Sequence, residues 1–274
     1  MKKALLRLLR FLSLGYVLVV LAVAGCQNSL LYHPRVLPEP TLLQAAPAKG
    51  VEPWRDASGA LIGWRIPNPR AKARLLVFHG NAIDAIERAQ YLRTFNSLSG
   101  GDHWETCVME YPGYGARPGS PGRSGFYKAG RGAINELRNV DKRPIFLLGE
   151  SLGSATACAM AAEQPDAISG LLLIVPFARV ADVAKRVMPY IPVGLMLRDR
   201  YDNIEPLQKY RGPVAIVVAE NDEVVSAEQG RLLHSRYAGP KLLIEMPGTS
   251  HNAFDLAPNA AWVRETDAFL QRGR

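Results

Sequence analysis

Cysteine is scarce in this chain: only three of the 274 residues are Cys, too few for a framework of disulfides. Cys26 lies in the N-terminal segment, whereas Cys107 falls in an expected strand and Cys158 in an expected buried helix. Because a free cysteine packs as a small apolar residue, we expect two separate thiols in the core. The cysteines and histidines form no cluster at metal-ligand spacing, so no bound metal ion is expected.

Long runs of lysine and arginine are also missing, and no strip of aromatic and basic residues alternates along the chain. The formal net charge is +8, of which Lys2, Lys3, Arg7 and Arg10 supply four, so a scattered +4 remains on the rest. Nucleic-acid-binding proteins gather positive charge on one face or in one groove. Nucleic acid is therefore not expected as a partner. Internal repeats and low-complexity blocks are absent as well.

The N-terminus reads as a targeting segment, with basic MKKALLRLLR followed by apolar FLSLGYVLVVLAVAG. This apolar stretch is shorter than the roughly 18–20 residues of a comfortable membrane span. The small residues of LAVAGC resemble the lipobox of bacterial lipoprotein signals, which implies cleavage before Cys26 and its diacylation. The alternative is an uncleaved anchor helix from Leu5 onward, with Arg7 and Arg10 extended toward the membrane surface. Either reading places the protein in the cell envelope outside the cytoplasm, and Gln27 resembles sorting to the periplasmic side of the outer membrane.

We divide the chain into three parts. Residues 1–26 are the signal segment, residues 27–50 are an expected tether rich in Pro and Ala, and residues 51–274 form one domain. WRDASGALIGWRIP predicts a hairpin. Continuous apolar runs predict buried strands, and helical patterns separate most of them. These runs are ARLLVF, TCVME, PIFLLG, ISGLLLIV, PVAIVVA and PKLLIEM. The alternation predicts an α/β fold, a mostly parallel sheet with helices on both faces, which binds ligands at the carboxyl ends of its strands.

The segment PIFLLGESLGSATACAMA places Ser151 between a buried strand and a helix of small residues. Gly149 and Gly153 remove side chains where the two backbones crowd, which lets the serine adopt a strained conformation with its hydroxyl exposed. Ser151 is therefore our candidate nucleophile. The alternative is a tight turn that carries an inert serine.

A serine hydroxyl needs a base within hydrogen-bond reach, and the base needs an orienting acid. Only two histidines follow Ser151. His251 lies in a loop after the last apolar strand, where such a base is delivered, whereas His234 falls inside an expected helix. Asp222, in the loop of AENDEVV, is the candidate acid, and a plain solvated acidic turn is its alternative. Three other carboxylates, in the region after the fourth apolar run, fit less well: Asp182, Asp199 and Asp202.

Attack on a carbonyl creates an oxyanion that requires two hydrogen-bond donors. The main-chain amide of Leu152, directly after the candidate nucleophile, is one. The second is expected from the loop after an early strand, through the amide of Asn81, with Ala82 as the other option. His79 in the same loop is expected to hold the loop rather than to act as a base.

Five separated motifs, HGNA, EYPGYGARPGSP, GESLGS, AENDEVV and GTSHN, occur in the order found in α/β-hydrolase-fold serine hydrolases. More narrowly, the chain resembles the Bem46-like and alpha/beta-hydrolase-domain 13 and 17 group over roughly residues 50–272. It departs from larger lipases in two places. The early loop reads HGN rather than HGGG, and the region FARVADVAKRVMPYIPVGLMLRDRYDN forms a short cap insert instead of a lid.

The resemblance implies two-step acyl transfer by Ser151, His251 and Asp222 on an ester, thioester or amide, without a cofactor. Tyr111 and Tyr114 of YPGYG either contact the substrate or only form a turn, with Tyr111 in the core. Apolar residues of the insert either cover an acyl chain or cap the core. We expect a membrane-tethered serine hydrolase acting on small-molecule or lipid-like acyl groups. The competing hypotheses are a non-catalytic binding lipoprotein on the same fold and a serine peptidase.

Overall fold

The computed structural model describes residues 2–273 and contains one eight-stranded sheet, in the order β1-β2-β4-β3-β5-β6-β7-β8. The strands are β1 (Glu52–Arg55), β2 (Leu61–Ile66), β3 (Ala73–Phe78), β4 (Trp104–Met109), β5 (Ile145–Glu150), β6 (Ile168–Ile174), β7 (Val214–Ala219) and β8 (Lys241–Met246). β1 pairs with β2 and β2 with β4 in antiparallel fashion, and all pairs from β4 to β8 are parallel. The predicted hairpin and the mostly parallel sheet are confirmed.

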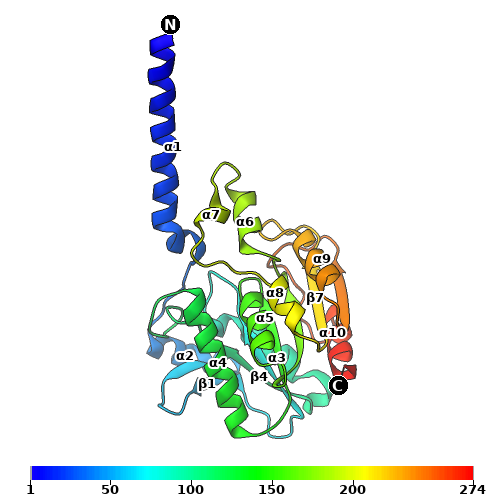
Figure 1. The fold of residues 1–274 in the computed structure, drawn as a ribbon. Helices are drawn as coiled ribbons and strands as arrows, with labels where there is room; N and C mark the ends of the chain where they lie inside the picture. Colours follow the sequence, from blue (N-terminus) through cyan, green and yellow to red (C-terminus); the bar gives the residue numbers. More distant parts are fainter. Residues whose placement is uncertain (1, 274) are drawn as a thin grey trace.

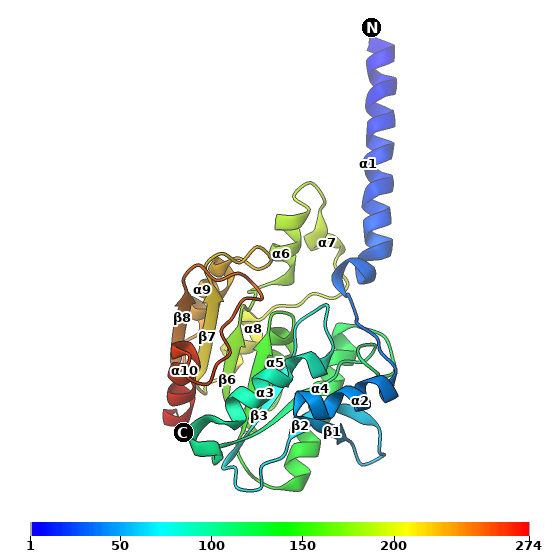
Figure 2. The ribbon, with the colours of Figure 1, turned by 180° about the vertical axis from the view of Figure 1, so that it is seen from behind.

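Helices cover both faces of the sheet. One face carries α4 (Arg123–Val140), α5 (Gly153–Glu163), α8 (Ile204–Lys209) and α9 (Ala227–Arg236), which lie in front of the sheet in Figure 1. The other carries α2 (Glu39–Lys49), the 3-10 helix η1 (Ala85–Arg88), α3 (Ala89–Asn96) and α10 (Ala261–Arg272), seen in Figure 2. A second 3-10 helix, η2 (Leu98–Gly101), follows α3. The α/β architecture expected from the sequence is confirmed.

Two apolar cores follow from this layering. Successive strand side chains point to opposite faces, so Leu76 and Phe78 of β3 join one core while Leu75 and Val77 join the other. Central strands buried on both faces therefore need continuous apolar runs, which is the pattern that their sequences show.

The predicted core thiols are free, and both are buried in the same apolar core. Cys107 lies in β4 and Cys158 in α5, and the two do not form a disulfide. Burial raises the pKa of both thiols well above its usual range, so each remains a protonated, apolar packing group.

The N-terminal segment forms one helix, α1 (Lys2–Leu31), that continues through the exposed Cys26. By length and composition this helix could cross a membrane or serve as a signal sequence, and its apolar window is not buried against the rest of the protein. Figure 1 shows it projecting away from the body, beside α6 (Val180–Val187) and α7 (Val193–Met196) of the insert.

Residues 27–50, expected as a tether, are folded against the domain. Leu42 and Ala46, one helical turn apart on α2, are buried in the core that also holds α3. Upstream of α2, the Leu37 amide donates to the Gly115 carbonyl at 3.0 Å, and the Gly115 amide donates to the Arg35 carbonyl at 2.8 Å. The Pro- and Ala-rich composition gave no signal of this short helix, whose burial depends on a tertiary partner.

Candidate active site

Ser151 lies on the sharp corner between β5 and α5, with φ of +49°. This left-handed conformation is strained for a serine. It is held by the Ser151 amide, which donates to the Ile174 carbonyl of β6 at 2.9 Å. A Cβ at Gly149 would lie 2.6 Å from Ser154 Cα, and one at Gly153 would lie 2.0 Å from the Phe78 carbonyl oxygen. The corner therefore requires both glycines, as the sequence predicted.

The three candidate catalytic side chains meet at the carboxyl edge of the sheet. His251 Nδ1 lies 2.7 Å from Asp222 Oδ2, and His251 Nε2 lies 3.2 Å from Ser151 Oγ. Because a carboxylate only accepts, the neutral ring carries its proton on Nδ1 and presents a lone pair to the serine hydroxyl. The other oxygen of Asp222 accepts the amides of Val224 at 2.8 Å and Val225 at 2.6 Å. These two hydrogen bonds hold the Asp222 carboxylate in place, and the carboxylate in turn orients the imidazole ring of His251.

Little water reaches this pair of groups. The side chain of His251 is 9% exposed and that of Asp222 only 1%. Low dielectric surroundings strengthen the attraction between the carboxylate and an imidazolium that forms when the ring accepts a proton. The arrangement can therefore remove a proton from Ser151 and stabilise the resulting charge.

The other histidine and acids considered from the sequence lie elsewhere. His234 is on α9, where partial burial and the neighbouring Lys241 lower its pKa. Asp182 is exposed on α6, and Asp199 accepts a hydrogen bond from Tyr32. Asp202 pairs with Arg179 at 2.8 Å. Of these candidate histidines and acids, the structure brings His251 and Asp222 to Ser151.

Two buried glutamates, which were not among the candidates from the sequence, hold the loop after β3. Glu150 Oε2 accepts the Gly80 amide at 3.1 Å. Glu110 Oε1 lies 3.1 Å from His79 Nε2, while His79 Nδ1 lies 2.8 Å from the Gly80 carbonyl oxygen. Their position in the sequence could have indicated this role, because each acid lies at or just after the carboxyl end of an apolar strand. His79 holds the loop as expected.

Asn81 is tied into this loop by its side chain. Its amide group donates to the Leu31 carbonyl at 2.7 Å, and its oxygen accepts the His33 amide at 3.1 Å and the Tyr114 hydroxyl at 2.7 Å. Within residues 2–273, the main-chain amides of Asn81 and Leu152 have no hydrogen-bond acceptor. Both N–H groups are therefore available to a ligand.

Tyr111 and Tyr114 do not line an opening at the site. Both side chains are fully buried, and Tyr111 stacks on Phe126 with ring centroids 4.1 Å apart. Tyr111 also packs on the His79 ring at 4.4 Å. Of the two alternatives for these pocket candidates, substrate contact is therefore wrong and the turn with Tyr111 in the core is right, because the aromatic rings of the turn complete the core beneath the loop that carries Asn81.

A cavity of about 430 Å³ flanks the corner, between the loop after β3, α3 and the loop that carries His251. Its wall combines apolar Ile83, Phe254 and Leu256 with polar Arg88 and Glu150. The two polar residues form an ion pair at 2.6 Å. No group of three or more His, Cys, Asp or Glu side chains in the described part of the chain could hold a metal ion.

Comparisons with known proteins place the chain in a family. A family model described as "Serine aminopeptidase, S33" matches residues 69–201, which include Ser151 but end before Asp222. The protein Rv2307c of Mycobacterium tuberculosis is 30% identical over 258 residues, 92% of this chain and 90% of that protein. Protein bem46 of Schizosaccharomyces pombe is 29% identical over 197 residues, 68% of this chain and 63% of that protein.

Among solved structures, the esterase Pf2001 of Pyrococcus furiosus superposes with a TM-score of 0.66 at 15% identity, covering 88% of this chain and 97% of that one. At that identity the likeness speaks for the fold alone. The eight-stranded sheet, the strand-to-helix corner and the sequence relatives agree with one another. The chain belongs to the α/β-hydrolase family and, within it, to the Bem46-like proteins.

Proposed function

We propose that this hydrolase is a serine hydrolase that cleaves ester or thioester bonds of acyl substrates through an acyl-enzyme. The observation that carries the proposal is the position of His251, whose two ring nitrogens lie within hydrogen-bond distance of Ser151 Oγ and Asp222 Oδ2. A serine hydroxyl is a poor nucleophile at neutral pH unless a base takes its proton as it attacks.

In the first step, His251 Nε2 accepts the Ser151 proton while Oγ forms a bond to the acyl carbon. The carbonyl oxygen becomes an oxyanion, which the free amides of Leu152 and Asn81 are proposed to bind. Asp222 stabilises the imidazolium without taking its proton. The imidazolium then gives the proton to the leaving alcohol or thiol as the bond to the acyl carbon breaks.

Water completes the cycle. His251 removes a proton from a water molecule, whose oxygen attacks the ester formed with Ser151. Collapse of the second oxyanion returns the proton to Ser151 Oγ and releases a carboxylic acid. The protein's own groups therefore suffice for every proton transfer, and the proposal needs no cofactor.

The charges around the flanking cavity favour acyl esters over peptides with a free N-terminus. An aminopeptidase requires an unpaired acid to hold the substrate ammonium. The two cavity acids are both engaged, Glu150 by Arg88 at 2.6 Å and Glu87 by Lys49 at 3.1 Å. Apolar side chains of the same wall suit the hydrocarbon part of an acyl group.

The N-terminal helix supports the proposal that the enzyme works at a membrane of the cell envelope. Either α1 remains as an anchor, or the chain is cleaved and diacylated at Cys26 and held by its lipid, with Gln27 directing it to the periplasmic side of the outer membrane. Both routes leave the catalytic domain attached to a membrane surface.

A fluorophosphonate probe tests the nucleophile directly, because it bonds covalently to an activated serine. The full chain in detergent should be labelled, Ser151→Ala should not, and Ser250→Ala should react normally. Ser250 is a suitable control because it is a partly exposed serine next to His251. Labelling that persists in Ser151→Ala, or no labelling of the wild-type chain, would reject the proposal, and the second outcome would favour a non-catalytic binding role.

A further inference from the structure

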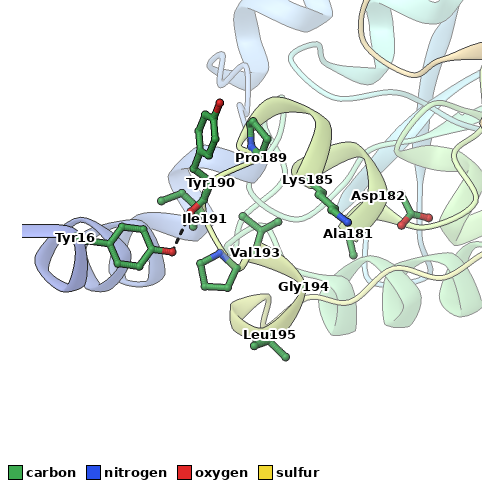
Figure 3. Close-up of a pocket in the computed structure, with 11 residues that line it drawn as sticks. Tyr16, Ala181, Asp182, Lys185, Pro189, Tyr190, Ile191, Val193, Gly194 and Leu195 are labelled. Atoms are coloured by element: carbon green, nitrogen blue, oxygen red, sulfur yellow. Dashed lines mark hydrogen bonds between the residues drawn. The ribbon is translucent and has the colours of Figure 1, made fainter. Parts of the chain in front are cut away.

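The cap insert carries the two most exposed large apolar side chains of the catalytic domain and a third that is strongly exposed. Val187, Tyr190 and Leu195, here called the insert tip, are 69%, 86% and 81% exposed. Tyr190, between α6 and α7, and Leu195, within α7, point outward from the backbone of the insert (Figure 3). Exposed apolar groups gathered at one place mark a surface that meets another apolar phase.

The insert lies alongside α1 at two levels. At its base, the oxygen of the buried Gln27 side chain accepts the Arg198 amide at 2.7 Å. Nearer the N-terminus of α1, the Tyr16 hydroxyl donates to the Tyr190 carbonyl at 2.9 Å (Figure 3). Between these contacts, apolar side chains of α1 and α6 face one another across a cavity of about 170 Å³. The insert and α1 therefore share one side of the molecule (Figures 1 and 2).

This placement fixes the depth of the insert tip relative to α1. Tyr16 lies inside the uncharged stretch that runs from Phe11 to Cys26. With a rise of about 1.5 Å per residue, Tyr16 lies roughly 16 Å along the helix from Gln27. Half of the hydrocarbon core of a bilayer is about 15 Å thick. If α1 enters a membrane, the insert tip beside Tyr16 must enter it too.

Charges around the insert tip match the headgroup region of such a membrane. Four basic side chains of the insert are exposed and form no ion pair with any of the residues that the structure describes: Lys185, Arg186, Arg198 and Arg200. An apolar tip on a segment that also carries exposed basic residues is the composition of segments that bind at the surface of an anionic bilayer.

We propose that the insert tip is a second membrane contact, which inserts into the same leaflet as the N-terminal anchor and turns the Ser151 edge of the sheet toward the lipid. The insert follows β6 and Ser151 follows β5, and the carboxyl ends of these neighbouring parallel strands lie at one edge. The docking contact stands on its own. The implied substrate class, acyl esters or thioesters drawn from the bilayer, rests on the proposed function.

The insert tip can contact the membrane whether α1 is kept or removed. If α1 stays, it delivers the insert tip into the bilayer. If the chain is cleaved before Cys26, the insert tip still extends past the level of Gln27, because Tyr190 lies at the level of Tyr16 while Arg198 lies beside Gln27.

Fluorescence quenching by lipids tests the docking. The full chain with Cys26→Ser, in which Cys107 and Cys158 stay buried, receives a single new cysteine at Val187 or at Val140 and a nitrobenzoxadiazole label. The two valines are matched, because each is 69% exposed, and Val140 ends α4 at the edge of the body opposite α1 (Figure 1). In vesicles of phosphatidylethanolamine and phosphatidylglycerol with doxyl-labelled acyl chains, we expect several-fold stronger quenching at 187.

Equal quenching at the two positions would overturn the proposal. A blue-shifted emission at 187 without lipid quenching would also overturn it, because a second copy of the chain or another protein would then cover the insert tip.

Activity tests the substrate class separately. Tyr190→Asp with Leu195→Asp should lower the ratio of vesicle-embedded to soluble ester hydrolysis about tenfold or more, since burying two charges in lipid is unfavourable. An unchanged ratio would reject the bilayer as the source of substrate. If the wild-type chain hydrolyses neither ester, the proposed function fails, while the quenching result still decides the docking.

Discussion

His251 Nε2 lies 3.2 Å from Ser151 Oγ, although 100 positions separate the two residues in the chain. The distance depends on two loops at the same edge of the sheet, one after β5 and one after β8. Side chains around these two loops and around the loop after β3 hold this geometry in place, and changing them should have measurable effects.

Asp222→Asn should lower kcat for a soluble p-nitrophenyl ester by about 10⁴-fold while leaving the fold intact. The asparagine oxygen can still accept the amides of Val224 and Val225, which directs its NH₂ group at His251 and forces the ring into the wrong tautomer. Asp202→Asn is the matched control. Asp202 also accepts amides two and three residues ahead, those of Ile204 and Glu205, but contacts the exposed Arg179 instead of a histidine. Equal losses in both variants would remove Asp222 from the mechanism.

Glu150→Ala should reduce kcat by about 10–100-fold, because the loop that carries Asn81 loses the carboxylate that accepts the Gly80 amide at 3.1 Å. Glu150→Gln should lose much less, since its amide oxygen can still accept that N–H. The measurement is kcat and KM for a short-chain ester, with circular dichroism to check folding. A positioning role predicts a loss mainly in kcat, so an effect confined to KM would contradict it.

Gly153→Ala should destabilise the protein by about 1–3 kcal/mol or more, because the new Cβ would lie 2.0 Å from the Phe78 carbonyl oxygen. Gly132→Ala is the matched helix control: no atom lies within 4 Å of its added Cβ, and alanine favours the helix by about 0.5–1 kcal/mol. Urea denaturation should therefore move the two midpoints in opposite directions. A neutral Gly153→Ala would mean that the strand-to-helix corner is looser than these distances imply.

Asp84→Asn should stabilise the protein at neutral pH. Burial and then the nearby Glu110 charge raise the pKa of the Asp84 carboxyl, whose Oδ2 has no hydrogen-bond partner and lies 3.5 Å from Arg35 Nε. A raised folded-state pKa means that Asp84 costs stability as pH rises above the unfolded value of 3.8. The advantage of asparagine should therefore be largest above the raised pKa and disappear below pH 3.8.

Thermal unfolding at several pH values measures this effect, and Asp141→Asn supplies the opposite sign. Although partial desolvation opposes it, the contacts of Asp141 with Arg143 and Arg74 lower the pKa of Asp141. That variant should lose stability at neutral pH and approach the wild type in acid. If both variants shifted in the same direction at neutral pH, the assignment of Asp84 as a strained buried charge would be wrong.

Local patterns in the sequence determined most of the fold. Apolar runs marked the buried strands because a strand covered on both faces admits no polar alternation. Gly149 and Gly153 marked the strained corner at Ser151, since only glycine fits where two backbones touch. The order of Ser151, Asp222 and His251, each after an apolar strand, was enough to select the three side chains that the structure brings together.

Only the tertiary structure decided what lies beneath and beside the carboxyl edge of the sheet, where the three candidate catalytic side chains meet. Tyr111 and Tyr114 stand in a glycine-rich turn whose sequence allows either direction, and their burial depends on the His79 and Phe126 rings from distant segments. The folding of residues 27–50 onto the domain and the position of the insert against α1 also arise from contacts between remote parts of the chain. Periodicity and turn chemistry depend on residues that are close in the sequence. These features depend instead on which elements the order of the strands in the sheet places side by side in space.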